Sequence, residues 1–192
     1  MKKDIILCGV GGQGILSIAT IIGEAATKAG VNLKQAEVHG MSQRGGDVQS
    51  NLRLSTEPIY SDLIAQGGCD VVISMEPMES LRYLPYLSKN GVIVTSNKPF
   101  INIPNYPEEA ALFAELGALP NEVIKLDIEQ VAKDTGNARG ANMVLLGMAA
   151  PFIEIVTVEQ LRSAIATISA RKGDAVVEAN LKAFDEGVKV SK

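Results

Sequence analysis

The fold is decided by the opening stretch Asp4-Ile5-Ile6-Leu7-Cys8-Gly9-Val10-Gly11-Gly12-Gln13-Gly14-Ile15-Leu16. A short apolar run rich in Ile and Leu is typical of a buried strand, and a helical pattern follows the glycines. Gly9, Gly11 and Gly14 have the G-x-G-x-x-G spacing of a dinucleotide-binding turn, in which glycine permits the bend and a close backbone approach to a phosphate. We expect the amides of Gly12, Gln13 and Gly14 to form an anion site at the positive end of the helix. A turn whose glycines serve only packing is the alternative.

Length and composition favour one α/β domain over residues 1–192. The chain is 46% hydrophobic but only 4% aromatic, with no Trp, so aliphatic side chains and Met must fill the core. Such a core suits strands that are covered on both faces. We therefore expect a single Rossmann-like three-layer domain with a mostly parallel sheet and an antiparallel edge strand.

Several classes of function are disfavoured by the same numbers. A net charge of −4 and few aromatic residues give no basis for a nucleic-acid surface. The sequence shows no long apolar segment and no signal-peptide pattern, so we expect a cytoplasmic protein without a membrane partner. Cys8 and Cys69 lie in strand patterns and are expected to be buried, and two cysteines cannot hold a four-thiolate iron–sulfur cluster. With His39 as the single histidine, no metal site is predicted.

Hydrophobic periodicity and turn residues predict the remaining elements. Further strands are expected at residues 33–38, 47–54, 70–74, 92–95 and 122–126. Helices are expected at 13–29, 76–87, 107–116, 127–133, 141–150, 157–169 and 174–189, with a helical turn at 62–66 and a loop at 100–107.

The segment 47–54 departs from an ordinary Rossmann unit, which would continue with a second crossover helix here. Its apolar residues alternate with polar ones, which predicts a half-exposed strand, antiparallel and at an edge of the sheet. Just before it, Glu37 ends the second strand about 20 residues after the glycine turn, where an NAD site would place its ribose ligand. A solvated carboxylate at a strand end is the alternative for Glu37.

Three motifs together carry a resemblance to a known family. They are Gly9-Val10-Gly11-Gly12-Gln13-Gly14, Glu37-Val38-His39-Gly40-Met41-Ser42-Gln43-Arg44-Gly45-Gly46 and Asn142-Met143-Val144-Leu145-Leu146-Gly147. The chain resembles the gamma component of 2-oxoacid:ferredoxin oxidoreductases, and more closely the branch of the indolepyruvate ferredoxin oxidoreductase beta subunit. The similarity covers nearly the whole chain, and the second motif is the most specific. An arylpyruvate or phenylacetate-type relative also remains open.

The resemblance implies a coenzyme A-dependent oxidative decarboxylation of a 2-oxoacid, with ferredoxin as electron acceptor. In such complexes thiamine diphosphate, with its Mg, and iron–sulfur clusters supply the difficult chemistry. This chain lacks the Gly-Asp-Gly element expected for thiamine diphosphate and the cysteines needed for clusters. We therefore expect a subunit that binds none of these cofactors alone, is inactive alone, and works with a larger alpha subunit that carries them.

The expected binding site combines the glycine turn with the polar loop of the second motif. Arg44 suits bidentate contact with a phosphate or a 2-oxoacid carboxylate, or else contact with a partner subunit. His39 is a proton relay or, alternatively, a structural residue, and Gln13 and Ser42 are placed to orient phosphate or pantetheine oxygens. No catalytic residue is assigned. The expected cofactor-binding residues are Gly9, Gly11, Gly12, Gln13, Gly14, His39, Ser42, Gln43, Arg44, Gly45 and Gly46.

Two other functions fit parts of the sequence. Gly9, Gly11, Gly14 and Glu37 also suit a self-sufficient NAD-dependent oxidoreductase, although no substrate domain is evident. A nucleotide- or acyl-carrier-sensing module without catalysis is the other alternative.

Overall fold

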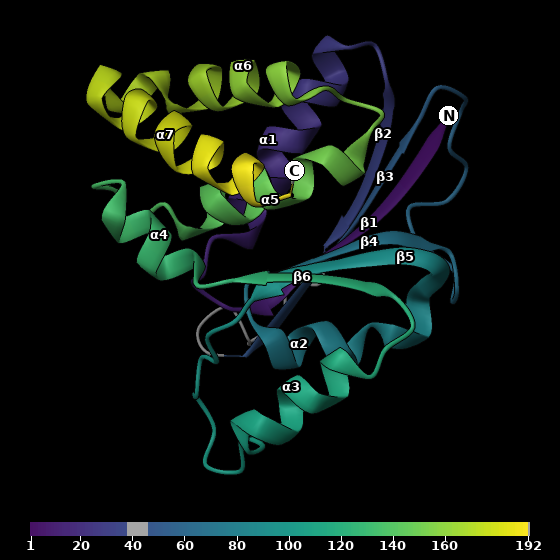
Figure 1. Ribbon diagram of the computed structural model, residues 1–192. Helices are drawn as coiled ribbons and strands as arrows, with labels where there is room; N and C mark the ends of the chain where they lie inside the picture. The colour runs from purple at the N-terminus through teal and green to yellow at the C-terminus, as the bar shows by residue number, and fades with distance from the viewer. Residues whose placement is uncertain (38–45, 192) are drawn as a thin grey trace.

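The computed structural model describes residues 1–37 and 46–191, which form a mixed sheet with helices on both faces (Figure 1). The order of the six strands in this part of the chain is β2-β3-β1-β4-β5-β6. β1, β4, β5 and β6 run parallel, whereas β3 runs antiparallel to both of its neighbours, β1 and β2. The strands are β1 (Lys2–Val10), β2 (Asn32–Glu37), β3 (Asp47–Ser55), β4 (Cys69–Ser74), β5 (Leu87–Ser96) and β6 (Glu122–Leu126).

The helices complete three layers, as the sequence predicted. One face of the sheet carries α1, α4, α5, α6 and α7, and the opposite face carries α2 and α3 (Figure 1). The helices are α1 (Ile15–Lys28), α2 (Pro77–Arg82), α3 (Glu109–Gly117), α4 (Ile128–Asp134), α5 (Ala141–Ile153), α6 (Val158–Ser169) and α7 (Asp174–Val190), with 3-10 turns η2 (Leu84–Tyr86) and η3 (Ala170–Lys172). None of the described helices is long and apolar enough to cross a membrane.

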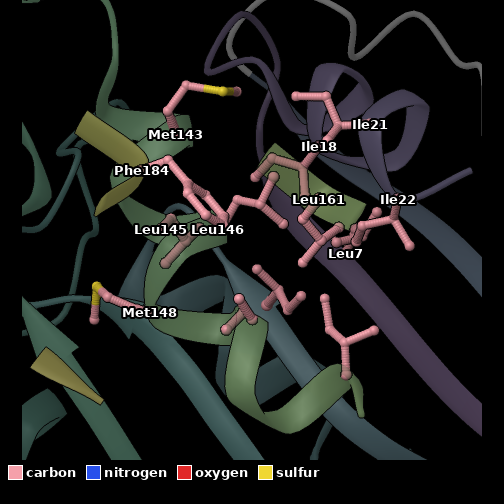
Figure 2. Packing of buried hydrophobic residues seen from close by; sticks show 14 of the residues in the cluster. Leu7, Ile18, Ile21, Ile22, Met143, Leu145, Leu146, Met148, Leu161 and Phe184 are labelled. Carbon is pink, nitrogen blue, oxygen red and sulfur yellow. The ribbon is translucent and has the colours of Figure 1, made fainter. Parts of the chain in front are cut away.

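The larger core lies between the sheet and the five-helix face, and it is aliphatic, as composition indicated. Leu7 of β1 packs there with Ile18 of α1, Leu146 of α5 and Phe184 of α7 (Figure 2). A Cβ at Gly147 would overlap the carbonyl oxygen of Phe184, so α5 and α7 touch backbone to backbone. The third sequence motif, which ends at Gly147, therefore serves helix packing at its carboxyl end.

The strand at 47–54 is antiparallel, as predicted, but it does not lie at the edge. β2 pairs with its outer side and is the edge strand. The polar residues that suggested exposure make contacts within the protein instead. Arg53 donates from Nε to Oδ1 of the buried Asp4 over 2.8 Å, and Ser50 is buried. Alternation along one strand indicates which face is polar, but it does not report the order of strands in the sheet.

Three other boundaries differ from the sequence prediction. The helix expected at 76–87 stops at Arg82 and continues as a 3-10 turn around Pro85, because proline lacks the amide that the helix needs. β5 starts at Leu87, so the expected turn at Asn90-Gly91 lies within the strand. Residues 62–66 do not form the expected helical turn. Asp62 and Leu63 lie in a bend, and the carbonyl oxygens of Ser61 and Leu63 accept hydrogen bonds from Arg53.

Two predicted helix starts are confirmed. Thr157 and Gln160 form a reciprocal capping box, with Gln160 N donating to Thr157 Oγ1 over 3.2 Å and Thr157 N donating to Gln160 Oε1 over 2.7 Å. Asp127 accepts from Gln130 N over 2.9 Å and so caps α4.

Candidate functional site

The chain reverses its direction of winding at the carboxyl ends of β1 and β4. α1 leads from β1 to β2 across one face of the sheet, whereas α2 leads from β4 to β5 across the other (Figure 1). In open α/β sheets, ligands bind outside the carboxyl ends of the strands at such a switch point. The glycine turn follows β1 at this point, and Met75-Glu76 follows β4.

The glycine turn is closed by Gln13. The amide of Gln13 donates to Val10 O over 3.1 Å, and its side-chain Oε1 accepts from Val10 N over 2.7 Å. The described residues provide no acceptor for the amides of Gly12 and Gly14. Gly12 is exposed with φ 101°, and a Cβ there would meet nothing within 4 Å. The expected anion site thus narrows to Gly12, Gly14 and the first turn of α1, which holds no acidic side chain.

The third sequence motif reaches the same turn. Asn142 Nδ2 donates to Gly14 O over 3.3 Å, and a Cβ at Gly14 would lie 2.8 Å from that nitrogen. At the other end of α5, Glu154 pairs with Lys3 of β1 over 2.5 Å, so α5 runs opposite to β1. The N-termini of α1 and α5 therefore meet at the glycine turn, and both helix dipoles favour negative charge there.

One described residue of the second motif lies against the turn. Gly46 O accepts a hydrogen bond from Gly11 N over 2.8 Å. The structure thus brings together Gly9, Gly11, Gly12, Gln13, Gly14 and Gly46 from the expected set. His39, Ser42, Gln43, Arg44 and Gly45 lie outside the described residues.

Glu37 does not occupy the place of an NAD ribose ligand. It ends β2 and accepts a hydrogen bond from Gln35 Nε2. Because β3 lies between β2 and β1, Glu37 belongs to a strand about 10 Å from the glycine turn rather than to the neighbouring strand. A dinucleotide-binding unit places these two strands side by side.

A buried carboxylate beside the turn was not singled out from the sequence. Glu76 is 0% exposed and its Oε2 accepts from Glu79 N over 2.9 Å, which caps α2. Its Oε1 accepts from Phe100 N over 3.3 Å and from the Tyr106 hydroxyl. Burial raises the pKa of Tyr106, and its hydrogen bond to Glu76 adds to the increase. Glu76 followed by Pro77 indicates a helix start in the sequence, but not a carboxylate shared with a later loop.

The two cysteines are free and buried, as the sequence predicted. Burial raises the pKa of Cys8 and raises that of Cys69 to about 12, so both stay protonated near neutral pH. Iron–sulfur clusters need thiolates, and these two thiols do not fit that role. In the described ranges, no three His, Cys, Asp or Glu side chains gather closely enough to hold a metal ion.

Comparison with known proteins gives full-length matches. Residues 4–190 match the family described as pyruvate ferredoxin/flavodoxin oxidoreductase. The chain is 36% identical over 202 residues to indolepyruvate oxidoreductase subunit IorB of Pyrococcus horikoshii, covering 100% of this chain and 98% of that protein.

Solved structures share the fold. The gamma subunit of a keto/oxoacid ferredoxin oxidoreductase from Geobacter sulfurreducens has a TM-score of 0.72 and 27% identity, with 98% of both chains covered. A 2-oxoglutarate:ferredoxin oxidoreductase from Magnetococcus marinus, solved with 2-oxoglutarate, coenzyme A and succinyl-CoA bound, has a TM-score of 0.78 at 22% identity. That match covers 99% of this chain but 31% of the other.

Proposed function

Because the chain belongs to the pyruvate ferredoxin/flavodoxin oxidoreductase family, we propose that it is the subunit without cofactors of an indolepyruvate or arylpyruvate:ferredoxin oxidoreductase. Its relatives named as indolepyruvate oxidoreductase subunits match along almost their whole length. The 2-oxoglutarate synthase subunits are less similar, at 25–29% identity. This difference in identity supports the indolepyruvate branch.

The proposed reaction is the coenzyme A-dependent oxidative decarboxylation of the 2-oxoacid, with ferredoxin accepting the electrons. A larger alpha subunit carries thiamine diphosphate, Mg and iron–sulfur clusters, which supply carbanion stabilisation and electron transfer when bound. The buried thiols of Cys8 and Cys69 support this division of labour. The cytoplasm, expected from the sequence, is part of the proposal.

The single observation that carries a binding role is the glycine turn at the switch point. The amides of Gly12 and Gly14 lack acceptors among the described residues, and two helix N-termini meet beside them. These features fit a phosphate of coenzyme A. We infer that Ser42, Gln43 and Arg44 of the second motif add side-chain contacts to the same phosphate. The other role open to the glycine turn and the second motif is to support a loop of the alpha subunit over thiamine diphosphate.

Arg44 and His39 have a second role within the same proposal. Arginine is enriched in protein interfaces, so Arg44 contacts either the phosphate or the alpha subunit. His39 is correspondingly a proton relay or a structural residue. Neither assignment is needed for the subunit role itself.

Titration with NADH separates this proposal from a self-sufficient NAD-dependent oxidoreductase. The purified chain is expected to leave nicotinamide fluorescence unchanged, because β3 separates Glu37 from the glycine turn. Saturable NADH binding together with NADH-dependent turnover by the chain alone would contradict the proposal.

A further inference from the structure

Glu76 connects three segments at the carboxyl edge of the sheet. Its carboxylate caps α2 through Glu79 N and accepts hydrogen bonds from Phe100 N and the Tyr106 hydroxyl. The segment between Phe100 and Tyr106 has no regular structure of its own, and Phe100 is 44% exposed. The buried Glu76 carboxylate therefore anchors both ends of this segment.

The backbone next to Glu76 supports the glycine turn. Met75 N donates to Cys8 O over 3.0 Å, and a Cβ at Gly9 would lie 3.0 Å from Met75 Cβ and 2.9 Å from Gln13 Oε1. Gly9 therefore packs so closely against Met75 and Gln13 that no side chain would fit between them. A shift of Met75 would move Gly9 and Gln13 as well. The glycine turn, the start of α2 and the segment after β5 all lie along the same edge (Figure 1).

We propose that Glu76 is a positioning residue, which fixes the glycine turn in its ligand-binding shape through Met75 and anchors the Phe100–Tyr106 segment beside it. The inference rests on the proposed binding of coenzyme A at the turn. A buried acid is costly unless donors surround it, and here two amides and a hydroxyl supply them. Removal of the carboxylate leaves these three donors unpaired, so the segment and the first turn of α2 both loosen.

Near-isosteric variants test this without removing bulk from the core. Tyr106→Phe removes one hydroxyl, and Glu76→Gln keeps a single acceptor oxygen. Glu79→Gln is the matched control, because Glu79 is a buried acid of the same helix whose carboxylate accepts its hydrogen bond from Arg82 and not from Phe100 or Tyr106.

Two readouts are needed, and neither follows from global stability alone. Hydrogen exchange measured by mass spectrometry on peptides spanning 97–107 reports the loop in the isolated chain. The KM for coenzyme A, measured in the complex reconstituted with the alpha subunit, reports the turn. We expect Glu76→Gln and Tyr106→Phe to accelerate exchange and to raise this KM about fivefold, the value of one hydrogen bond, while kcat stays within about twofold. Glu79→Gln changes neither quantity.

Unchanged exchange in Glu76→Gln would overturn the positioning role. Faster exchange with an unchanged KM would overturn its link to the binding site. A Gln43→Ala/Arg44→Ala double variant distinguishes failure of this inference from failure of the proposed function. If the KM for coenzyme A rises in the double variant but not in Glu76→Gln, the positioning role of Glu76 is wrong and the proposed function stands.

Discussion

The amide of Gly11 donates to the carbonyl oxygen of Gly46 over 2.8 Å, which joins the glycine turn to the end of the second sequence motif. The antiparallel pairing of β1 with β3 makes this contact possible, since Val10 lies opposite Asp47 in the register. A crossover helix after β2 would have returned the chain at the other end of the sheet. The strand that departs from the Rossmann pattern is thus what brings the two motifs together.

The part of the second motif that precedes Gly46 in the sequence is the first place to test the proposed binding site. We expect Gln43→Ala/Arg44→Ala to lower turnover of the reconstituted complex and to raise the KM for coenzyme A by about tenfold or more, because the proposed bidentate contact of Arg44 with a phosphate is lost. The melting temperature of the subunit should stay unchanged. Normal coenzyme A kinetics would remove the ligand role and leave only assembly, which a pull-down with the alpha subunit measures.

Two substitutions of Gln13 test separately whether this side chain closes the glycine turn and whether the turn attracts an anion. Gln13→Ala removes the acceptor of the Val10 amide and should cost about 1–2 kcal/mol of unfolding free energy in urea titrations. Gln13→Glu keeps an acceptor but brings a negative charge to the site, so it should raise the KM for coenzyme A roughly tenfold while retaining more stability than Gln13→Ala. Equal coenzyme A kinetics in Gln13→Glu and the unmodified protein would argue against an anion site.

The contact between α5 and α7 makes a prediction about stability alone. A methyl group at Gly147 would overlap the Phe184 carbonyl, so Gly147→Ala should destabilise the chain by at least about 3 kcal/mol or prevent folding. Gly117→Ala is the control, since a Cβ at the end of α3 meets nothing within 4 Å and alanine favours the helix by about 0.5–1 kcal/mol. Similar melting temperatures for the two variants would show that the helices separate easily.

Both cysteines should resist alkylation in the folded protein. Because burial raises their pKa values, little thiolate forms at pH 8, and Cys69 approaches half-ionisation only near pH 12. Iodoacetamide at pH 8 should therefore modify neither thiol in the native chain and both in denaturant, as read by intact mass. Rapid native labelling of Cys8 or Cys69 would contradict their buried, unreactive state.

Local patterns predicted most of the fold because their causes are local. The glycine turn, the capping box at Thr157 and the apolar run of β4 each depend on residues close in sequence, and all three were found. The position of β3 in the sheet depends instead on β2, which pairs with the edge of β3 that faces away from β1. Arg53 resembles an exposed residue in the pattern, although it pairs with Asp4 of a distant strand.

The candidate site was predictable only in part, for the same reason. Glycine spacing predicted the turn. It did not predict that the Gln13 amide donates to Val10 O, which follows from the shape of the closed turn. The burial of Glu76 depends on Tyr106, which arrives from a loop 30 residues later. No periodicity within either segment signals that meeting.

The most direct test of the subunit role is purification of the tagged chain from its native host, followed by dye reduction that depends on indolepyruvate and coenzyme A. The account predicts capture of a larger iron–sulfur subunit and activity that disappears when either substrate is omitted. Recovery of the chain alone, with no activity restored by any co-expressed partner, would contradict it.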